Sequence, residues 1–474
     1  MRCRIFLSLL VLVTFNVSAQ NKWTLQQCVD YALKNNISVK QSDVLSRLSK
    51  LTATQGQMTL YPNLTGSASG SYQHGLSENP TTGTLSSASF IGGNIGVQST
   101  YNIFDWYARR NTIIANNLNS KADLVGIDKA RNDVALVVAN AFLQVMLRRE
   151  QSKISELQMN QSRLQLVNTR KFVDAGSQPE LNALQIETQF AKDSAALLQA
   201  QSLINQAMIN LKASINYDFT LPFDIASPDL ASIKIDNITD LLPEVIYQIA
   251  LDSQPIQKQY KLKIQAGLYE IKAAKGFMYP SLTAFGQLNT RAIDSKTIPV
   301  ITQLPDEQIG YVNVNGSKYP VFTPSFGVSN FKGTPLFKQF KNNFGQAVGL
   351  SLNFSIFNAY INRTQWERTK INVQQLQLQQ EQENLNLKTN IYNAYQDAFS
   401  SFQKYNASHR TVEYSQKAFD IANKRYNIGL LGTLDFIITQ NNLYLTQIEE
   451  ISNKYDYIFK MKVLEFYKGK GIKL

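Results

Sequence analysis

Few residues in this chain have the types and spacing that catalysis or metal binding requires. The two histidines, His74 and His409, fall in different predicted elements and form no metal-ligand motif. No Gly-rich phosphate loop, Ser/His/Asp set or carboxylate pair stands out from the surrounding helical pattern. The net charge is +12, but the Lys and Arg residues are scattered, which argues against nucleic-acid binding and leaves a weak preference for anionic partners or cargo. We therefore expect no catalysis, no cofactor and no metal site.

The first 19 residues have the pattern of a secretory signal. Two arginines precede a mostly apolar run at 5–15, and small residues lead to a cleavage site after Ala19. The alternative, a membrane anchor, is disfavoured because the run is too short to span a bilayer. Cleavage there leaves Cys28 as the only cysteine, which excludes an internal disulfide. We expect an exported protein with a signal peptide at 1–19.

An internal repeat defines the predicted organisation of the chain. "DYALKNNISVKQ" at 30–41 lines up with "QIALDSQPIQKQ" at 248–259, an offset of 218. Further along, "YNIFDWYARR" at 101–110 lines up with "FSIFNAYINR" at 354–363, an offset of 253. All 35 extra residues of the second half therefore lie in one interval. An insertion confined to one interval predicts a loop that extends outward.

Each half has the pattern of a helix, a strand, a loop, a strand, a long helix, a tight turn and a helix. The first repeat, 20–237, is predicted to contain helices at about 25–58, 105–173 and 178–214 and strands at about 63–73 and 94–104. The second repeat, 238–474, is predicted to contain helices at about 240–276, 358–426 and 433–467, strands at about 281–290 and 346–357, and a long Pro- and Gly-rich loop at 291–344. After residue 19 no apolar run is expected to be long enough for a membrane helix, so any membrane segment must consist of strands.

The helix that follows each tight turn carries a seven-residue apolar repeat. The positions are Phe190, Leu197, Ile204 and Leu211 in the first repeat and Ile437, Tyr444, Ile451 and Ile458 in the second. A sustained seven-residue spacing keeps one seam against a neighbouring helix and predicts coiled-coil packing.

The predicted strands alternate an apolar face with a small or polar face. In the last strand Val348, Leu350 and Leu352 alternate with glycine, serine and asparagine. Strands of about ten residues cross a bilayer when tilted; the alternative is a soluble sheet with one wet face. Aromatic residues gather at the helix-side ends of the strands, as in a membrane-interface girdle, and favour the membrane: Tyr61, Phe104, Trp106, Tyr107, Tyr279, Phe357 and Tyr360.

Four strands are too few to close a barrel of useful width. Two open edges would remain, and each unpaired backbone group in lipid costs several kcal/mol. If the strands lie in a membrane, each edge must pair with another copy of the chain, in a ring with cyclic symmetry. Three copies would give twelve strands and four copies sixteen, and the strand argument alone does not choose between them.

The exported start, the duplicated layout and the glycine turns resemble the TolC family of outer-membrane efflux proteins. "WTLQQCVDYALKNN" is similar to the family's opening helix, and "RYNIGLLGTLDFI" at 425–437 is similar to its Arg-Tyr-x-x-Gly…Asp pattern. The resemblance implies a mainly α fold with a membrane β-barrel part, closing as a homotrimer into a 12-stranded β-barrel and a 12-helix α-barrel in the periplasm. It also implies outer-membrane lipid, a periplasmic adaptor (membrane fusion) protein and an inner-membrane pump of RND, ABC or MFS type as partners.

The resemblance places the two tight turns at the periplasmic tip. It assigns adaptor contact to Ile428-Gly429-Leu430 and, more weakly, to Ala175-Gly176-Ser177. A helix C-cap, in which glycine takes the left-handed conformation, is the alternative explanation of both glycines, and both roles can hold at once.

The resemblance places a constriction beside the second turn. Asp435 matches a position where a ring of carboxylates would select cations; the alternative is an acidic residue favoured at a helix N-terminus. Tyr426 matches a gate-associated tyrosine, and Asp174 at the first turn is assigned to the same aperture. Leu431 replaces an arginine and Ile438 a second aspartate of some relatives, so we expect a more hydrophobic constriction than a charged latch.

We therefore predict a passive outer-membrane channel-tunnel, the exit duct of a tripartite efflux or type I secretion system for drugs, small molecules or polypeptides. The main alternative is an exported coiled-coil scaffold or adhesin without transport. A periplasmic adaptor is disfavoured because that class usually has one helical hairpin flanked by small β-modules, whereas two long hairpins and four strands are predicted here.

Overall fold

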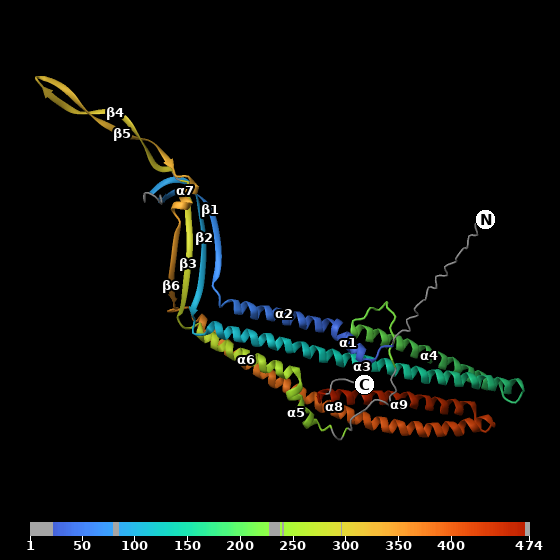
Figure 1. The fold of residues 1–474 in the computed structure, drawn as a ribbon. Coiled ribbons are helices and arrows are strands. Elements are labelled where there is room, and N and C mark those ends of the chain that lie inside the picture. Colours follow the sequence, from blue (N-terminus) through green and yellow to red (C-terminus); the bar gives the residue numbers. More distant parts are fainter. Residues whose placement is uncertain (1–21, 79–84, 227–237, 239–240, 295, 470–474) are drawn as a thin grey trace, which may run out of the picture. The chain divides into compact units, whose positions relative to one another are not determined.

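The computed structural model describes residues 22–78, 85–226, 238, 241–294 and 296–469 (Figure 1). The expected signal peptide at 1–19 lies outside this part of the chain. Two compact units are present. The helical unit contains Met1–Leu51, Asn117–Ala266 and Asn372–Leu474, and the strand unit contains Thr52–Asn116 and Gly267–Ile371.

Eight helices account for most of the described chain outside the sheets. They are α1 (Leu25–Asn35), α2 (Ile37–Met58), α3 (Ala108–Asp174), α4 (Glu180–Ile215), α5 (Pro243–Ser253), α6 (Pro255–Gly276), α8 (Ile361–Asn427) and α9 (Thr433–Tyr467). Within the helical unit α3 and α4 form one hairpin and α8 and α9 a second (Figure 1). The short helix α1 packs on α4, and α5 packs on α9.

Two stretches expected as continuous helices, 25–58 and 240–276, are each broken in the structure. Asn36 and Gln254 have extended backbones, with ψ of 136° and 129°, and their N–H groups donate to the carbonyls of Ala32 and Ala250. Pro255 explains the second break, because proline disfavours helical geometry in the residue before it. At the first break the Asn36 side chain instead accepts the N–H of Ser38 at 2.9 Å, which caps the start of α2.

The core of the helical unit explains the apolar middle of α3. Val138, Phe142 and Met146 of α3 are buried against Leu211 of α4 and Cys28 of α1. Of the described helices, α3 alone is long and apolar enough to cross a membrane, with an 18-residue window of mean hydropathy 1.2 that is 44% buried. The expectation that no such run follows residue 19 is therefore wrong for α3. Its burial in this core accounts for the apolar composition by helix packing.

The strand unit is built on a four-stranded antiparallel sheet. Its strands are β1 (Asn63–Glu78), β2 (Leu85–Phe104), β3 (Ser281–Ile293) and β6 (Gly345–Asn353), in the order β1-β2-β3-β6. The first three strands are longer than expected at the end away from the helices. The last is shorter than the expected 346–357, because its final residue, Asn353, already faces Ser281 at the start of β3.

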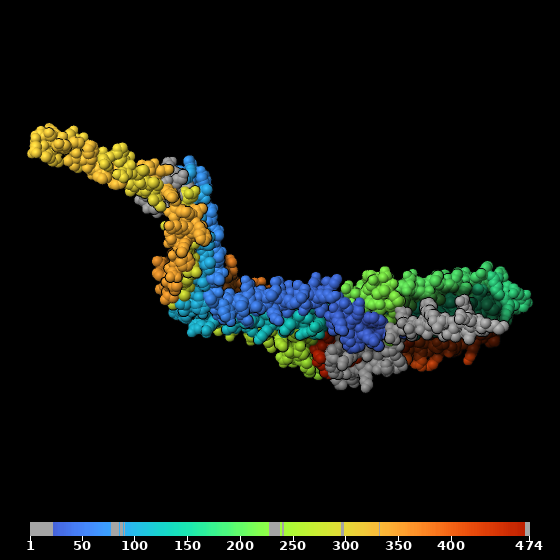
Figure 2. All heavy atoms as spheres, turned by 45° about the horizontal axis from the view of Figure 1, so that its top comes forward, coloured from blue at the N-terminus to red at the C-terminus, as the bar shows by residue number. Residues whose placement is uncertain are grey.

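The interval 291–344, expected as a loop, contains a long β-hairpin and a short helix. Strands β4 (Lys296–Val314) and β5 (Ser317–Gly333) pair with each other, and α7 (Leu336–Asn342) packs on β3. Figure 2 shows β4 and β5 as a narrow ribbon of atoms. Asn315 and Gly316 turn the hairpin with φ of 50° and 86°, and Asn-Gly is the strongest short-range hairpin signal. The loop was predicted from the confinement of the insertion to one interval, an argument that does not test for strands within it, and the prolines of this interval are tolerated in a two-stranded hairpin because both strands are sheet edges.

Candidate functional site

The four-stranded sheet has one apolar and one polar face. Leu64, Ser99, Gly286 and Val348 are successive cross-strand partners and therefore share a face. The neighbouring positions of that face carry Val97, Tyr101, Leu288 and Leu350, and Val348 itself is 91% exposed. The opposite face carries mainly Ser, Thr, Asn, Gln and Gly. An amphipathic sheet whose apolar side chains remain exposed in one chain has a surface for lipid and a surface for water.

The outer edges of this sheet have no strand partner within the described part of the chain. β1 and β6 are the first and last strands in the sheet order, and β4 and β5 form a separate two-stranded sheet. Each edge therefore presents a row of backbone groups that can pair with another chain.

Aromatic rings cluster where β2 passes into α3. Trp106 lies between Phe104 and Tyr279, with ring centroids 5.3 Å and 5.0 Å away. The indole Nε1–H of Trp106 donates to the carbonyl of Pro280 at 2.9 Å, which joins the two strand ends of the opposite repeats. All seven predicted interface aromatics remain at least 40% exposed. An amphipathic ring that is partly exposed and anchored by its polar end suits a membrane–water boundary.

The same strained backbone recurs at both strand-to-helix junctions. Trp106 and Tyr107 have φ of 54° and 61°, and Ala359 and Tyr360, 253 residues further on, have φ of 51° and 61°. Such values are uncommon for bulky side chains. An arginine three residues after each tyrosine lies over its ring, at 5.8 Å in the first repeat and 5.9 Å in the second. Sequence comparison of the two halves aligned these segments, but it could not reveal the left-handed pairs.

The first tight turn, after α3, is a Schellman motif. Gly176 has a φ of 72°, its N–H donates to Val173 O at 2.8 Å, and the N–H of Ser177 donates to Phe172 O at 2.9 Å. The Ser177 hydroxyl donates to the same carbonyl at 2.8 Å. Ala175, Gly176 and Ser177, the first predicted adaptor segment, are exposed around this turn.

The second tight turn, after α8, repeats this geometry. Gly429 has a φ of 75°, its N–H donates to Tyr426 O at 3.0 Å, and the N–H of Leu430 donates to Arg425 O at 2.8 Å. Ile428 and Leu430, the apolar residues of the second predicted adaptor segment, are exposed. The C-cap explanation of both glycines therefore describes their geometry, and it leaves the flanking apolar side chains available to a partner.

Tyr426 is buried within the hairpin tip. It is 3% exposed and stacks on Phe436, and its hydroxyl lies 3.3 Å from Thr169 Oγ1 and 3.4 Å from Thr433 Oγ1. The other buried members of this cluster are Ile186 of α4, Phe419 of α8 and Leu443 of α9, so the cluster joins the two hairpins. The sequence prediction did not identify Phe436 or Thr169, although Phe436 directly follows Asp435.

The other predicted aperture residues divide between the interior and the surface. Leu431 packs half-buried against the cluster around Tyr426. Asp435 and Ile438 are exposed and lie three residues apart in α9, so they occupy the same side of that helix. Asp174 is the exposed last residue of α3, in the other hairpin.

A second feature of the tip that the sequence prediction did not identify is a charged clamp within the first hairpin. Arg170 of α3 donates to both Glu180 and Glu187 of α4, each at 2.6 Å. Hydrogen bonds from the guanidinium to Glu187 and Glu180 raise the pKa of Arg170 further above its ordinary value. The ion pairs are solvent-exposed, so they contribute little to the stability of the hairpin and mainly restrict its geometry.

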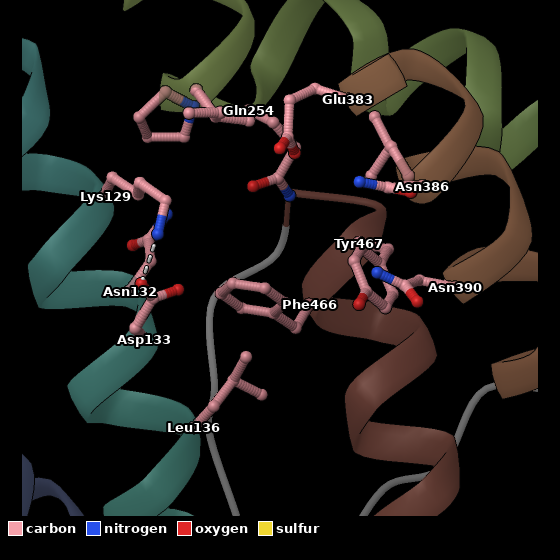
Figure 3. A pocket seen from close by; sticks show the side chains of 13 residues that line it. Lys129, Asn132, Asp133, Leu136, Gln254, Glu383, Asn386, Asn390, Phe466 and Tyr467 are labelled. Atoms are coloured by element: carbon pink, nitrogen blue, oxygen red, sulfur yellow. Dashed lines mark hydrogen bonds and ion pairs between the residues drawn. The ribbon is translucent and has the colours of Figure 1, made fainter. Parts of the chain in front are cut away.

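A small pocket with a mixed polar and apolar lining lies where α3, α6, α8 and α9 approach one another in the helical unit (Figure 3). It has a volume of about 160 Å³, and Lys129 donates to Asp133 at 2.7 Å along the side of the pocket that α3 forms. Glu383, Asn386 and Asn390 of α8 line the opposite side. The lining contains no serine, cysteine or histidine. Nor do three His, Cys, Asp or Glu side chains come together in a metal-binding group anywhere in the part of the chain that the structure describes.

An amphipathic sheet with open edges and two long helical hairpins define a class of membrane channel-forming proteins, and sequence comparison identifies the family. The family model described as "Outer membrane efflux protein" matches residues 28–217 and 246–466. The chain belongs to this family of TolC-type efflux channels, and it is located in the cell outer membrane and extends into the periplasm.

Solved structures share this fold at low sequence identity. The channel CusC has 17% identity and a TM-score of 0.75, covering 95% of this chain and 92% of that chain. The Campylobacter jejuni outer membrane channel CmeC has 17% identity and a TM-score of 0.72, covering 95% and 86%. The Vibrio cholerae outer membrane protein VceC has 16% identity and a TM-score of 0.70, covering 95% and 97%. No curated protein matched the chain.

Proposed function

We propose that this protein is the exit duct of a tripartite efflux or type I secretion system, and that it conducts substrate passively across the outer membrane. Three copies would join their four-stranded sheets into a 12-stranded β-barrel and their hairpins into a 12-helix α-barrel. The apolar face of each sheet would contact lipid, and the polar face would line the channel.

The single observation that supports this proposal best is the amphipathic sheet with two unpaired edges. An open edge in lipid leaves backbone groups without partners, at several kcal/mol each, and copies of the same sheet can satisfy those groups by pairing in a closed ring. An exported scaffold or adhesin without transport would not need an exposed apolar sheet face and a polar face on the same strands.

The two turns at the hairpin tips would meet a periplasmic adaptor, which in turn joins an inner-membrane pump of RND, ABC or MFS type. Ile428 and Leu430 project around Gly429, and Ala175 and Ser177 flank Gly176, as in a surface that receives apolar side chains of a helical partner. Asp435, Ile438, Leu431 and Asp174 would form the periplasmic aperture, with Tyr426 supporting it from inside.

A cysteine scan tests ring closure directly. In a Cys28→Ser background, Thr65→Cys on edge strand β1 is combined in turn with cysteines at positions 345–353 on edge strand β6. Oxidation should give disulfide-linked dimers and trimers for at least one register. The matched control places the first cysteine at Gln98, the cross-strand partner of Thr65 on the inner strand β2, and should give none.

Function is tested with the same protein in two further measurements. The purified protein should migrate as a heat-modifiable trimer and form discrete conducting channels in planar bilayers. A chain that remains monomeric in mild detergent, gives no cross-links in the scan and does not conduct would exclude the proposed duct.

A further inference from the structure

The helical unit contains a carboxylate buried among three helices. Asp193 of α4 is 5% exposed. Its Oδ1 accepts from Gln189 Nε2 at 2.8 Å, and its Oδ2 accepts from the Ser162 hydroxyl and from Gln158 Nε2, the latter at 3.4 Å. Ser162 and Gln158 belong to α3, so the carboxylate joins the two helices of the first hairpin through neutral donors.

The same cluster continues onto α9 of the second hairpin. Gln189 and Asn441 exchange amide hydrogen bonds of 2.9 Å and 3.2 Å, and Gln440 Nε2 donates to Ser162 Oγ at 3.4 Å. Gln440 is itself buried. Two of the groups bonded to Asp193, Gln189 and Ser162, are therefore also bonded to α9, and the carboxylate can influence how α9 packs on the α3–α4 hairpin.

The charged residues closest in sequence to this cluster are exposed. On α3 and α4 they are Glu156, Arg163, Glu187 and Lys192. α9 carries no charged residue between Asp435 and Glu449. α8 reaches this region through Phe419, which belongs to the same apolar cluster as Ile186 of α4. The charged residues of α8 there, Glu413, Lys417 and Asp420, are exposed, and Lys417 is bonded to Glu413 at 2.7 Å. The bonding partners of Asp193 are all neutral, so its ionised form is buried without a compensating cation.

We propose that Asp193 is a proton-responsive group that controls how tightly α9 packs on the α3–α4 hairpin. The protonated carboxyl is neutral and can donate its proton to Ser162 Oγ, whose own hydroxyl then donates to the carbonyl of Gln158 at 3.2 Å. It can therefore remain in the interface at little cost. The ionised carboxylate is better solvated by water and favours separation of the helices, which lets water reach the cluster. The response is a property of the channel wall and does not depend on which substrate the channel conducts.

The direction of the response follows from the buried state. Desolvation raises the pKa of Asp193 above its ordinary value, and the hydrogen bonds from Ser162, Gln189 and Gln158 oppose this shift only in part. The packing of α9 on the α3–α4 hairpin is therefore most stable at a pH below the pKa that Asp193 has when the helices are separated and its carboxyl is exposed. It loses stability as the pH rises through the higher pKa of the packed form. Helix separation is therefore favoured as the pH rises.

Hydrogen–deuterium exchange of the full-length protein in detergent tests this inference. Exchange of the α9 amides around Gln440 and Asn441, corrected for the intrinsic pH dependence of exchange, reports opening of the interface. Because one proton is involved, the equilibrium constant for opening should increase by up to about tenfold per pH unit between the pKa of Asp193 in the open form and its pKa in the packed form. Above the second pKa it should level off. In Asp193→Asn, which keeps the size of the side chain and cannot titrate, this dependence should disappear.

Two further variants separate titration from a structural role. Glu156→Gln removes an exposed carboxylate from α3 and should keep the wild-type pH profile. Gln189→Leu removes a hydrogen bond that lowers the pKa of Asp193, so it should move the midpoint of the profile to higher pH. A wild-type profile without a pH-dependent step, an unchanged step in Asp193→Asn, or an unmoved midpoint in Gln189→Leu would each overturn the proposal.

Discussion

Tyr426 stacks on Phe436, with ring centroids 4.6 Å apart and ring planes 22° from parallel. The first residue lies near the end of α8 and the second near the start of α9, so this contact closes the second hairpin directly behind Gly429. Thr169 of α3 lies within 3.3 Å of the tyrosine hydroxyl and extends the contact to the first hairpin. The tyrosine that the family resemblance assigned to the gate is therefore a packing residue of the tip in the single chain.

Tyr426→Ala should loosen the tip, whereas Tyr426→Phe should have a small effect. Removal of a buried aromatic ring costs about 3–5 kcal/mol, and loss of the hydroxyl alone about 0.5–1.5 kcal/mol. Limited trypsin digestion measures the difference, because Lys424 and Arg425 lie in the last turn of α8. Cleavage at these residues should be faster in Tyr426→Ala than in wild type, and nearly unchanged in Tyr426→Phe. Equal cleavage of all three proteins would show that the stack does not hold the tip.

The two glycine turns should respond alike to substitution. Gly176 and Gly429 both have positive φ, and an alanine in the left-handed region costs about 1–2 kcal/mol. No atom lies within 4 Å of an added Cβ at either site, so the cost comes from backbone strain alone. Gly176→Asn and Gly429→Asn should be better tolerated than the alanine variants, because asparagine accepts this conformation. Assembly with a cognate adaptor and tip proteolysis measure the effect, and a larger loss for asparagine than for alanine would contradict it.

The sequence was sufficient to predict the long helices and the strands because their patterns extend over many residues. The apolar and polar alternation of β6 and the unbroken pattern of α3 are examples. The sequence was insufficient where a single residue determines the local backbone conformation. Asn36 breaks a helix by accepting one backbone N–H with its side chain. An asparagine within a helical pattern does not by itself predict such a break. The hairpin of β4 and β5 contained its own signal, Asn315-Gly316, which the sequence analysis did not consider because it treated the inserted interval only as a loop.

The predicted site was harder to derive because burial depends on tertiary contacts. The sequence placed Tyr426, Leu431 and Asp435 at one tip, but it could not show that the first is buried while Asp435 is exposed. The polar cluster at Asp193 consists of residues that resemble an ordinary solvated face in sequence. Its partners are about 30 residues away on α3 and more than 240 away on α9, and no local pattern connects them.

A charge on the apolar face of β6 should block insertion, whereas the same charge on the polar face should not. Val348→Arg places a guanidinium where the proposed barrel contacts lipid, which costs about 2–4 kcal/mol at the bilayer midplane. Ala347→Arg, on the adjacent residue, places it on the polar face of the same strand. The amount of heat-modifiable trimer in the outer-membrane fraction should fall sharply for the first variant only. If both variants insert equally, or only Val348→Arg inserts, the assignment of the two faces is wrong.

Asp435→Asn should reduce the preference of the channel for cations. The carboxylate is exposed in the first turn of α9, and in a trimer three copies would ring the aperture. The selectivity is measured as the reversal potential in a salt gradient across a planar bilayer. In the variant this potential should shift toward zero, and it should depend less on the mean salt concentration. Asp420→Asn, an exposed aspartate of α8 about two turns before the tip, is the matched control and should leave the potential unchanged. An equal shift in both variants would mean that Asp435 contributes only to the general negative charge of the helices and that the aperture is lined by other groups.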